Sequence, residues 1–128
     1  MKIGFTGSRL GMTPVQYRAV RQLLAQLRSK IDSCHHGDCL GADESFHNLA
    51  RLFKLKLIIH PPTKPNFRAF LDGDETREPK DYLIRNKEMV DEVDRLIACP
   101  HTRKEVLRSG TWATVRYARK KGVLVTIL

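Results

Sequence analysis

The feature that most constrains this chain is a regular alternation of short apolar runs with longer amphipathic stretches. Strand-like runs lie at 2–6, 33–36, 55–59, 95–99 and 123–128. Such alternation is typical of βα units around a parallel sheet, because each parallel connection must cross back over one face of the sheet. We therefore predict an α/β fold: a Rossmann-like open parallel sheet of about five strands with helices on both faces.

Helices are predicted between these runs, at about 13–31, 42–53, 82–91 and 109–121. The first has the clearest start, because Thr13 can cap it, Pro14 suits the first helical position and Gln16 completes a capping box. Asp81 can cap the third. With 128 residues and no internal repeat, we expect one domain over residues 1–128.

The segment 63–80 is polar, rich in Pro, Gly and charge, and longer than ordinary loops. Such segments often carry function, so we expect either a ligand-facing flap or a mobile excursion.

The amino-terminal residues lead directly into a strand-like run, without the apolar region of a signal peptide. No stretch approaches the ~20 apolar residues that span a bilayer. We expect a cytoplasmic location and no membrane partner. The three cysteines, Cys34, Cys39 and Cys99, form no regular framework and are expected to be reduced thiols.

The formal charge is +9. Clustered Lys and Arg can neutralise nucleic-acid phosphates, but a phosphorylated small ligand or a well-solvated surface would also explain the charge. The last quarter of the chain is especially basic. It contains Arg103, Lys104, Arg108, Arg116, Arg119, Lys120 and Lys121.

Glycine and small polar residues recur just after the predicted strands. These corners are Gly7-Ser8-Arg9, Gly37-Asp38, His60-Pro61 and, one loop beyond its strand, Ser109-Gly110-Thr111. In open α/β sheets the carboxyl ends of the strands converge on one crevice where ligands bind. Glycines there let backbone N–H groups approach an anion, and helix N-termini add a favourable dipole. The set predicts a ligand crevice rather than ordinary turns.

Individual residues leave alternatives open. Ser8 and Arg9 suit a phosphate clamp or a tight turn with a solvated arginine. Neither G-x-G-x-x-G nor G-x-x-x-x-G-K-[ST] is present, so standard dinucleotide and P-loop mechanics are not supported. Asp38 and Asp43 bracket Gly41 and could hold a ribose hydroxyl or an amine, or cap the following helix.

Two further groups belong to the prediction. Trp112 could stack on a base or pack in the core with Val115. Arg85 and Asn86 lie in the middle of a predicted helix, a position more typical of a solvated helix face than of a ligand crevice. The predicted ligand-binding residues are Gly7, Ser8, Arg9, Gly37, Asp38, Gly41, Asp43, His60, Arg85, Asn86, Ser109, Gly110, Thr111, Trp112 and Thr114.

His35, His36, Asp38 and Cys39 are close enough in the sequence to suggest a metal site. No second cluster has zinc-like spacing, and adjacent strand residues point to opposite faces. We predict neither a metal nor a cofactor.

Five segments carry a family resemblance: KIGFTGSR at 2–9, HGDCLGAD at 36–43, IHPP at 59–62, DYLIRNK at 81–87 and SGTWAT at 109–114. In this combination and order, the chain resembles the SLOG superfamily of Rossmann-like domains. That superfamily includes the LOG-type nucleotide phosphoribohydrolases, the DprA/Smf DNA-processing proteins and the YpsA-like proteins. The resemblance implies a nucleotide-like ligand held by the first glycine corner and by the corner at 109–114.

The chain departs from the enzyme branch. The LOG motif P-G-G-x-G-T-x-x-E aligns with 109–117, where Ser109, Thr111 and Ala113 replace motif residues and Tyr117 stands at the glutamate. A tyrosine with a pKa near 10 cannot replace a carboxylate at neutral pH.

Three functions follow from this sequence. The first is a non-catalytic binder or sensor of a nucleotide or NAD-derived metabolite. The second is an N-glycosidase or related nucleotide hydrolase using another carboxylate, with Asp38, Asp43 and Asp81 as candidates. The third is single-stranded DNA binding in the manner of DprA, which the charge motivates. Because related folds often pair through helix faces, we also expect a homo-oligomer.

Overall fold

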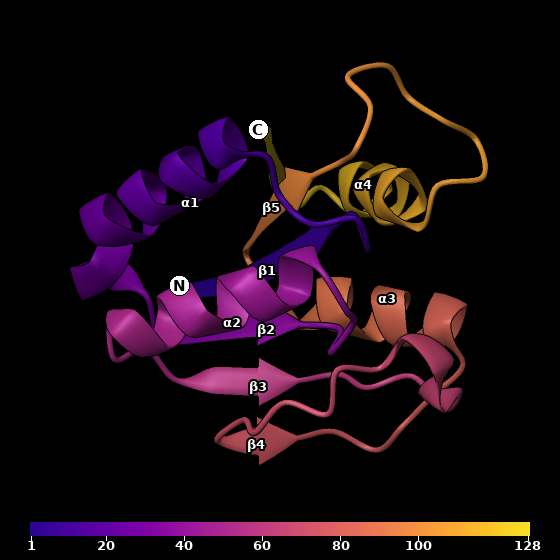
Figure 1. Ribbon diagram of the computed structural model, residues 1–128, viewed down its shortest axis with the longest axis horizontal. Coiled ribbons are helices and arrows are strands. Elements are labelled where there is room, and N and C mark those ends of the chain that lie inside the picture. Colours follow the sequence, from indigo (N-terminus) through magenta and orange to yellow (C-terminus); the bar gives the residue numbers. More distant parts are fainter.

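A computed structural model describes all residues 1–128 as a six-stranded sheet with helices on both faces (Figure 1). The strands are β1 (Lys2–Gly7), β2 (Ser33–His36), β3 (Leu57–Ile59), β4 (Glu75–Thr76), β5 (Arg95–Cys99) and β6 (Leu124–Ile127). The helices are α1 (Pro14–Leu27), α2 (Ala42–Leu52), α3 (Tyr82–Glu92) and α4 (Gly110–Lys120), with short 3₁₀ turns η1 (Arg28–Lys30) and η2 (Pro65–Phe67).

The sheet has the order β4-β3-β2-β1-β5-β6, and every pairing is parallel. The predicted class is therefore confirmed, but the expected five strands are six. The additional strand is β4, whose two residues pair with Ile58 and Ile59 of β3. It has no apolar run of its own, so the sequence pattern gave no sign of it.

Each face of the sheet has its own apolar core. On the face covered by α1 and α2, Ile3 and Phe5 of β1 pack with Leu24 of α1 and Phe46 of α2. On the other face, α3 and α4 pack against β5 through a second cluster. That cluster comprises Met89, Val90, Leu96, Ala98, Trp112, Val115 and Ala118. None of the helices is both long and apolar enough to cross a membrane.

The first helix begins as its sequence predicts. The Thr13 side chain accepts from the Gln16 backbone N–H at 3.1 Å, and the Gln16 side chain accepts from the Thr13 N–H at 2.9 Å. The Gln16 amide also donates to the carbonyls of Pro100 and Leu128, so it joins α1 to the far half of the sheet. Asp81 occupies the N-cap position of α3, but its side chain accepts no capping hydrogen bond, contrary to the prediction.

Candidate ligand-binding site

The chain reverses its direction across the sheet at β1. It first adds β2, β3 and β4 on one side of β1, and then returns to add β5 and β6 on the other. The carboxyl ends of β1 and β5 are adjacent, with Gly7 opposite Cys99 and the Ser8 N–H donating to the Cys99 carbonyl at 3.2 Å. Helices α1 and α4, which follow these two strands, cover opposite faces (Figure 1). This arrangement defines a topological switch point, where ligands bind in open α/β sheets.

The first corner packs tightly against the start of α2. The Ser8 carbonyl accepts from the N–H groups of Gly11 and Ala42, at 3.1 and 3.0 Å. A Cβ at Gly7 would lie 2.5 Å from the Cβ of Ala42, and one at Gly41 would lie 2.3 Å from the Arg9 carbonyl oxygen. Glycine is therefore required at both positions by packing.

The side chains of this corner are only partly free. The Ser8 hydroxyl accepts from the Leu10 N–H at 3.0 Å. The exposed Arg9 guanidinium lies 3.9 Å from the centroid of the Phe67 ring, a cation–π contact with the 63–80 segment. An arginine stacked in this way is held at the edge of the sheet while its N–H groups can still meet an anion.

The corner at the start of α4 offers free donors. Ser109 caps the helix by accepting from the Trp112 N–H at 3.3 Å, whereas the N–H groups of Gly110 and Thr111 donate to no group of the chain. A Cβ at Gly110 would meet nothing within 4 Å. Unpaired N–H groups at the positive end of the helix dipole are suited to an anion.

The second corner uses its carboxylates internally. Asp43 accepts from the N–H groups of Gly37 and Cys39, both at 3.1 Å, and burial raises its pKa to about 6. Asp38 is fully buried with a φ of 57°, and accepts from the Leu71 N–H and from Arg68 Nε, both at 2.8 Å. Backbone N–H groups of the turn thus hold Oδ2 of Asp43, and the 63–80 segment supplies partners to both carboxylate oxygens of Asp38.

Arg85 reaches the carboxyl edge from α3, but it binds protein backbone there. It is 5% exposed and donates to the carbonyls of Gly37 and His60, so it links the ends of β2 and β3. A Cβ at Gly37 would lie 2.5 Å from the Arg85 guanidinium. Its Nε has no partner in the chain. The solvated helix face favoured by the pattern is thus wrong for Arg85, while the neighbouring Asn86 is partly exposed.

Two histidines of β2 form buried pairs with His60, which follows β3, and His47, which lies in α2. His35 Nδ1 lies 2.9 Å from His60 Nε2, and His36 Nε2 lies 2.9 Å from His47 Nδ1. His35 and His36 therefore point to opposite faces of the sheet, as predicted. Burial lowers the pKa of His36 to about 3, and the pKa values of His35 and His60 to about 4. The His60 ring is 2% exposed and is thus occupied within the fold.

Trp112 belongs to the core between α3, α4 and the sheet. It is 4% exposed and packs with Val115, so base stacking is unsupported in this conformation. Its indole N–H has no partner in the chain. Thr111 and Thr114 are also buried, and the Thr114 hydroxyl donates to the Gly110 carbonyl at 2.9 Å.

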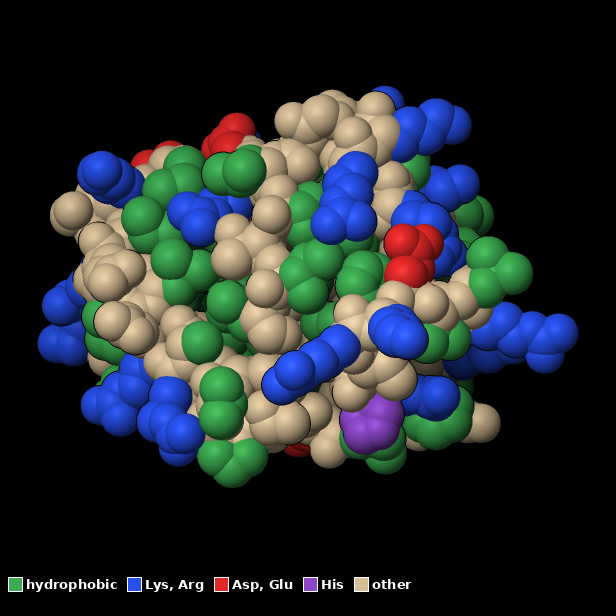
Figure 2. Space-filling model, turned by 90° about the horizontal axis from the view of Figure 1, so that it is seen from above, with side chains coloured by type: hydrophobic (Ala, Val, Ile, Leu, Met, Phe, Trp, Pro, Cys, Tyr) green, Lys and Arg blue, Asp and Glu red, His purple; other side chains and the backbone are tan.

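The loop between β5 and α4 supplies positive charge beside these donors. Arg103, Lys104 and Arg108 are exposed, whereas Glu105 is paired with Arg116 at 2.9 Å. Figure 2 views the molecule from the side on which this loop projects in Figure 1, and shows many Lys and Arg side chains with few acidic ones between them.

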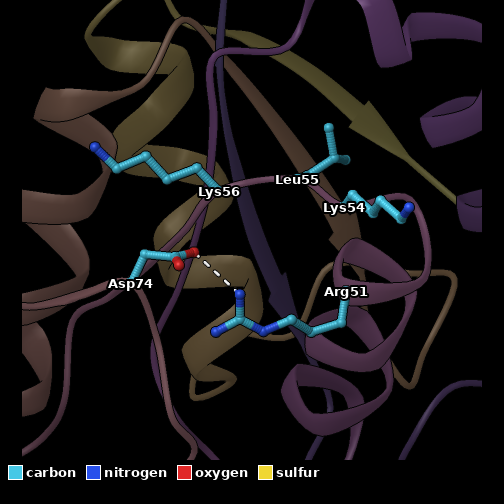
Figure 3. Close-up of a pocket in the computed structure, with 5 residues that line it drawn as sticks. All are labelled: Arg51, Lys54, Leu55, Lys56 and Asp74. Atoms are coloured by element: carbon cyan, nitrogen blue, oxygen red, sulfur yellow. Dashed lines mark hydrogen bonds and ion pairs between the residues drawn. The ribbon is translucent and has the colours of Figure 1, made fainter.

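Two cavities of the molecule are lined by no residue of the Gly7-Ser8-Arg9 or Ser109-to-Thr114 corners. One of about 520 Å³ lies near the amino end of β3 and is lined by Arg51, Lys54, Leu55, Lys56 and Asp74 (Figure 3). Its Arg51 and Asp74 are paired at 3.1 Å. Another of about 340 Å³ is lined by Arg77, Glu88, Asp91 and Glu92. The switch-point site is therefore defined by its donors and charges, and by neither of these cavities.

No protein-family model matches the sequence, and no curated protein matches it. Solved structures do match in fold. A molybdenum cofactor binding protein from Rippkaea orientalis has a TM-score of 0.75 at 21% identity, over 98% of this chain and 74% of that one. DprA from Streptococcus pneumoniae has a TM-score of 0.72 at 18% identity, and DprA from Helicobacter pylori one of 0.70 at 19%.

The fold is thus a Rossmann-like α/β fold shared with these structures, as the alternation of strands and helices predicted. The matches cover 98% and 99% of this chain, but only 49% and 64% of the Streptococcus and Helicobacter DprA chains.

Proposed function

We propose that this protein binds a nucleotide or an NAD-derived small anionic ligand between the carboxyl ends of β1 and β5, as a binding protein or sensor. The observation that carries the proposal is the pair of unpaired N–H groups at Gly110 and Thr111, with open space over Gly110. They belong to the helix that follows β5, whose end adjoins the Gly7-Ser8-Arg9 turn, and a basic loop leads into that helix. A phosphate is the chemical group that best matches such donors.

The contacts of the acidic residues favour binding over turnover. Tyr117, which replaces the LOG glutamate, donates its hydroxyl to Asp91 at 2.8 Å, and this hydrogen bond raises the pKa of Tyr117. Asp38 and Asp43 are both engaged by internal donors. A hydrolase would have to release one of these carboxylates, or use the exposed Asp81.

Single-stranded DNA is the second candidate. The formal charge of +9 and the exposed arginines and lysine of the 101–109 loop favour it. One matching structure is described as showing a single-stranded DNA binding mode of DprA, which supports testing it. Such binding would weaken steeply as salt rises, because phosphate neutralisation releases counterions.

The test is a thermal-shift panel of mononucleotides, NAD, ADP-ribose, cyclic dinucleotides and a single-stranded oligonucleotide. A ligand at a hundredfold excess over its Kd stabilises the folded state by about 2.7 kcal/mol, which moves the midpoint by several degrees. Chromatography of each hit then distinguishes a ligand recovered intact from a product of turnover.

Gly110→Glu is the decisive variant, because it places a carboxylate where the anion would lie without a steric clash. We expect at least a tenfold loss of affinity. Lys120→Gln is the control: it removes one positive charge at the opposite end of α4. Equal affinities for Gly110→Glu and the wild type would refute the site. Absence of any small-molecule shift, with salt-sensitive DNA binding, would select the second candidate.

A further inference from the structure

We propose that His35, His60 and Glu92 form a binding site for a divalent transition metal ion of the zinc type, separate from the switch-point site. His35 lies in β2, His60 directly follows β3, and Glu92 ends α3. Their ligand atoms all lie within 4.8 Å of one another. The nearest pairs are His35 Nδ1 to His60 Nε2 at 2.9 Å, and His60 Nε2 to Glu92 Oε2 at 3.3 Å.

The hydrogen bonds around these three residues leave lone pairs on the atoms that face one another. Ser33 Oγ lies 2.9 Å from His35 Nε2. When that nitrogen donates to Ser33, Nδ1 carries a lone pair directed at His60. Two imidazole nitrogens and a carboxylate oxygen then meet around a single hydrogen, the one on His60 Nε2. When His60 instead carries its proton on Nδ1, Nε2 also has a lone pair, and a metal ion in place of the Nε2 proton would satisfy all three bases.

The surroundings match those of metal ligands in proteins. Ligating histidines are held through their second ring nitrogen, and ligating carboxylates are themselves hydrogen-bonded. Here Ser33 holds His35, and Arg77 Nη2 donates to Glu92 Oε1 at 2.8 Å. Glu92 Oε2 accepts a longer bond from Arg77 Nε, at 3.4 Å, and lies 3.3 Å from His60 Nε2. Both histidines are buried, which favours the neutral imidazole that binds a metal ion.

The three ligands indicate which metal ion would bind, and a surface cavity gives that ion access to the site. Two histidines and one carboxylate suit zinc, with a remaining position for water. The histidines are 1% and 2% exposed, but Glu92 is half-buried and lines the cavity of about 340 Å³ with Glu88, Asp91 and Arg77. Lys80 and Lys121 reach Glu88 and Asp91 from the rim of this cavity, at 3.9 and 4.0 Å, so the carboxylates offer a cation oxygen ligands along the route but no large excess of negative charge.

The sequence offers His35, His36, Asp38 and Cys39 as clustered ligands, with no second cluster at zinc-like spacing. None of His60, Glu92 or Arg77 is close to those residues along the chain. The tertiary structure brings His60 to His35 across 25 positions.

The test begins with chelator-treated protein titrated with Zn²⁺ by calorimetry, and with Co²⁺ by visible absorption, at pH 7.5. We expect one equivalent of each, and Co²⁺ d–d bands of a four- or five-coordinate site with nitrogen and oxygen ligands. Glu92→Gln keeps the size of the side chain and removes the anionic ligand, so it should weaken Zn²⁺ binding at least tenfold. Glu88→Gln, which alters the same cavity but no ligand, should bind within twofold of the wild type.

A measurement on the unmodified protein guards against misfolding of the variant. Long-range ¹⁵N–¹H spectra of the histidine rings should show Zn²⁺ shifting His35 and His60, with Nδ1 and Nε2 respectively as the affected nitrogens. Shifts confined to the exposed His101 would overturn the site. So would the absence of stoichiometric binding, or a folded Glu92→Gln protein with wild-type affinity.

Discussion

The glycines at the carboxyl edge differ in what they contribute. Gly7 and Gly41 allow β1 and α2 to approach closely, and Gly37 makes room for the buried Arg85 guanidinium. Gly110, in contrast, faces open space. The sequence predicted all four as one class of ligand-approach glycine. Of these four glycines, only Gly110 could serve ligand approach alone, because the other three are required by packing.

Gly41→Ala should therefore destabilise the fold strongly. Its φ of 90° disfavours a side chain, and its Cβ would lie 2.3 Å from the Arg9 carbonyl oxygen. We expect a loss of about 3 kcal/mol in the free energy of unfolding, from backbone strain and overpacking together. Urea denaturation measures this loss. Gly110→Ala is the matched control and should change stability by less than about 1 kcal/mol; equal losses in the two variants would contradict the packing argument.

At the scale of elements, the 63–80 segment is joined to the body by specific contacts rather than extending freely. Ala69 N–H donates to the Asp38 carbonyl at 2.8 Å, and Leu40 N–H donates to the Phe67 carbonyl at 2.9 Å. The segment also supplies β4 and the Arg68 partner of Asp38. Its polar composition predicted a ligand-facing flap or a mobile excursion. Its anchoring depends on a buried aspartate some 30 positions earlier.

Arg68→Ala tests this anchor. It leaves the buried Asp38 carboxylate with only the Leu71 N–H, and removing one partner of a buried ion pair costs about 3 kcal/mol. We expect faster hydrogen exchange at the amides of Ala69 and Leu71, measured by mass spectrometry or NMR. Arg103→Ala, which removes an exposed arginine from the 101–109 loop, should leave both amides unchanged. Unaltered protection in Arg68→Ala would show that the segment is held by its backbone contacts alone.

At the scale of the whole molecule, buried histidines make stability depend on pH. The pKa values of His35, His36 and His60 are lowered by burial, so between about pH 6.5 and 4 the unfolded chain binds these protons and the folded chain does not. Asp43 acts in the opposite direction, because burial raises its pKa to about 6 and the folded state takes up its proton first. Because three histidines act in one direction and one aspartate in the other, the unfolded chain binds more protons than the folded chain over this pH range.

The metal-free protein should accordingly lose stability as pH falls from 6.5 to 4.5. Each net proton bound by the unfolded state contributes about 1.4 kcal/mol per pH unit, so a net difference of two gives a slope of about 2.7 kcal/mol per unit. Denaturant midpoints measured across this range, in chelator, give the slope directly. A midpoint that stays flat or rises on acidification would mean that these histidines titrate normally in the folded state.

The sequence by itself determined the α/β class, the first helix with its capping box, and the order of the glycine corners. These follow from local periodicity, turn chemistry and capping between residues three or four positions apart. Tertiary structure alone decided that Arg85 joins β2 to β3, that Arg68 pairs with Asp38, and that His35, His60 and Glu92 meet. Those contacts join residues 25 to 57 positions apart, and the partner of a buried polar group is set by which elements the sheet places side by side.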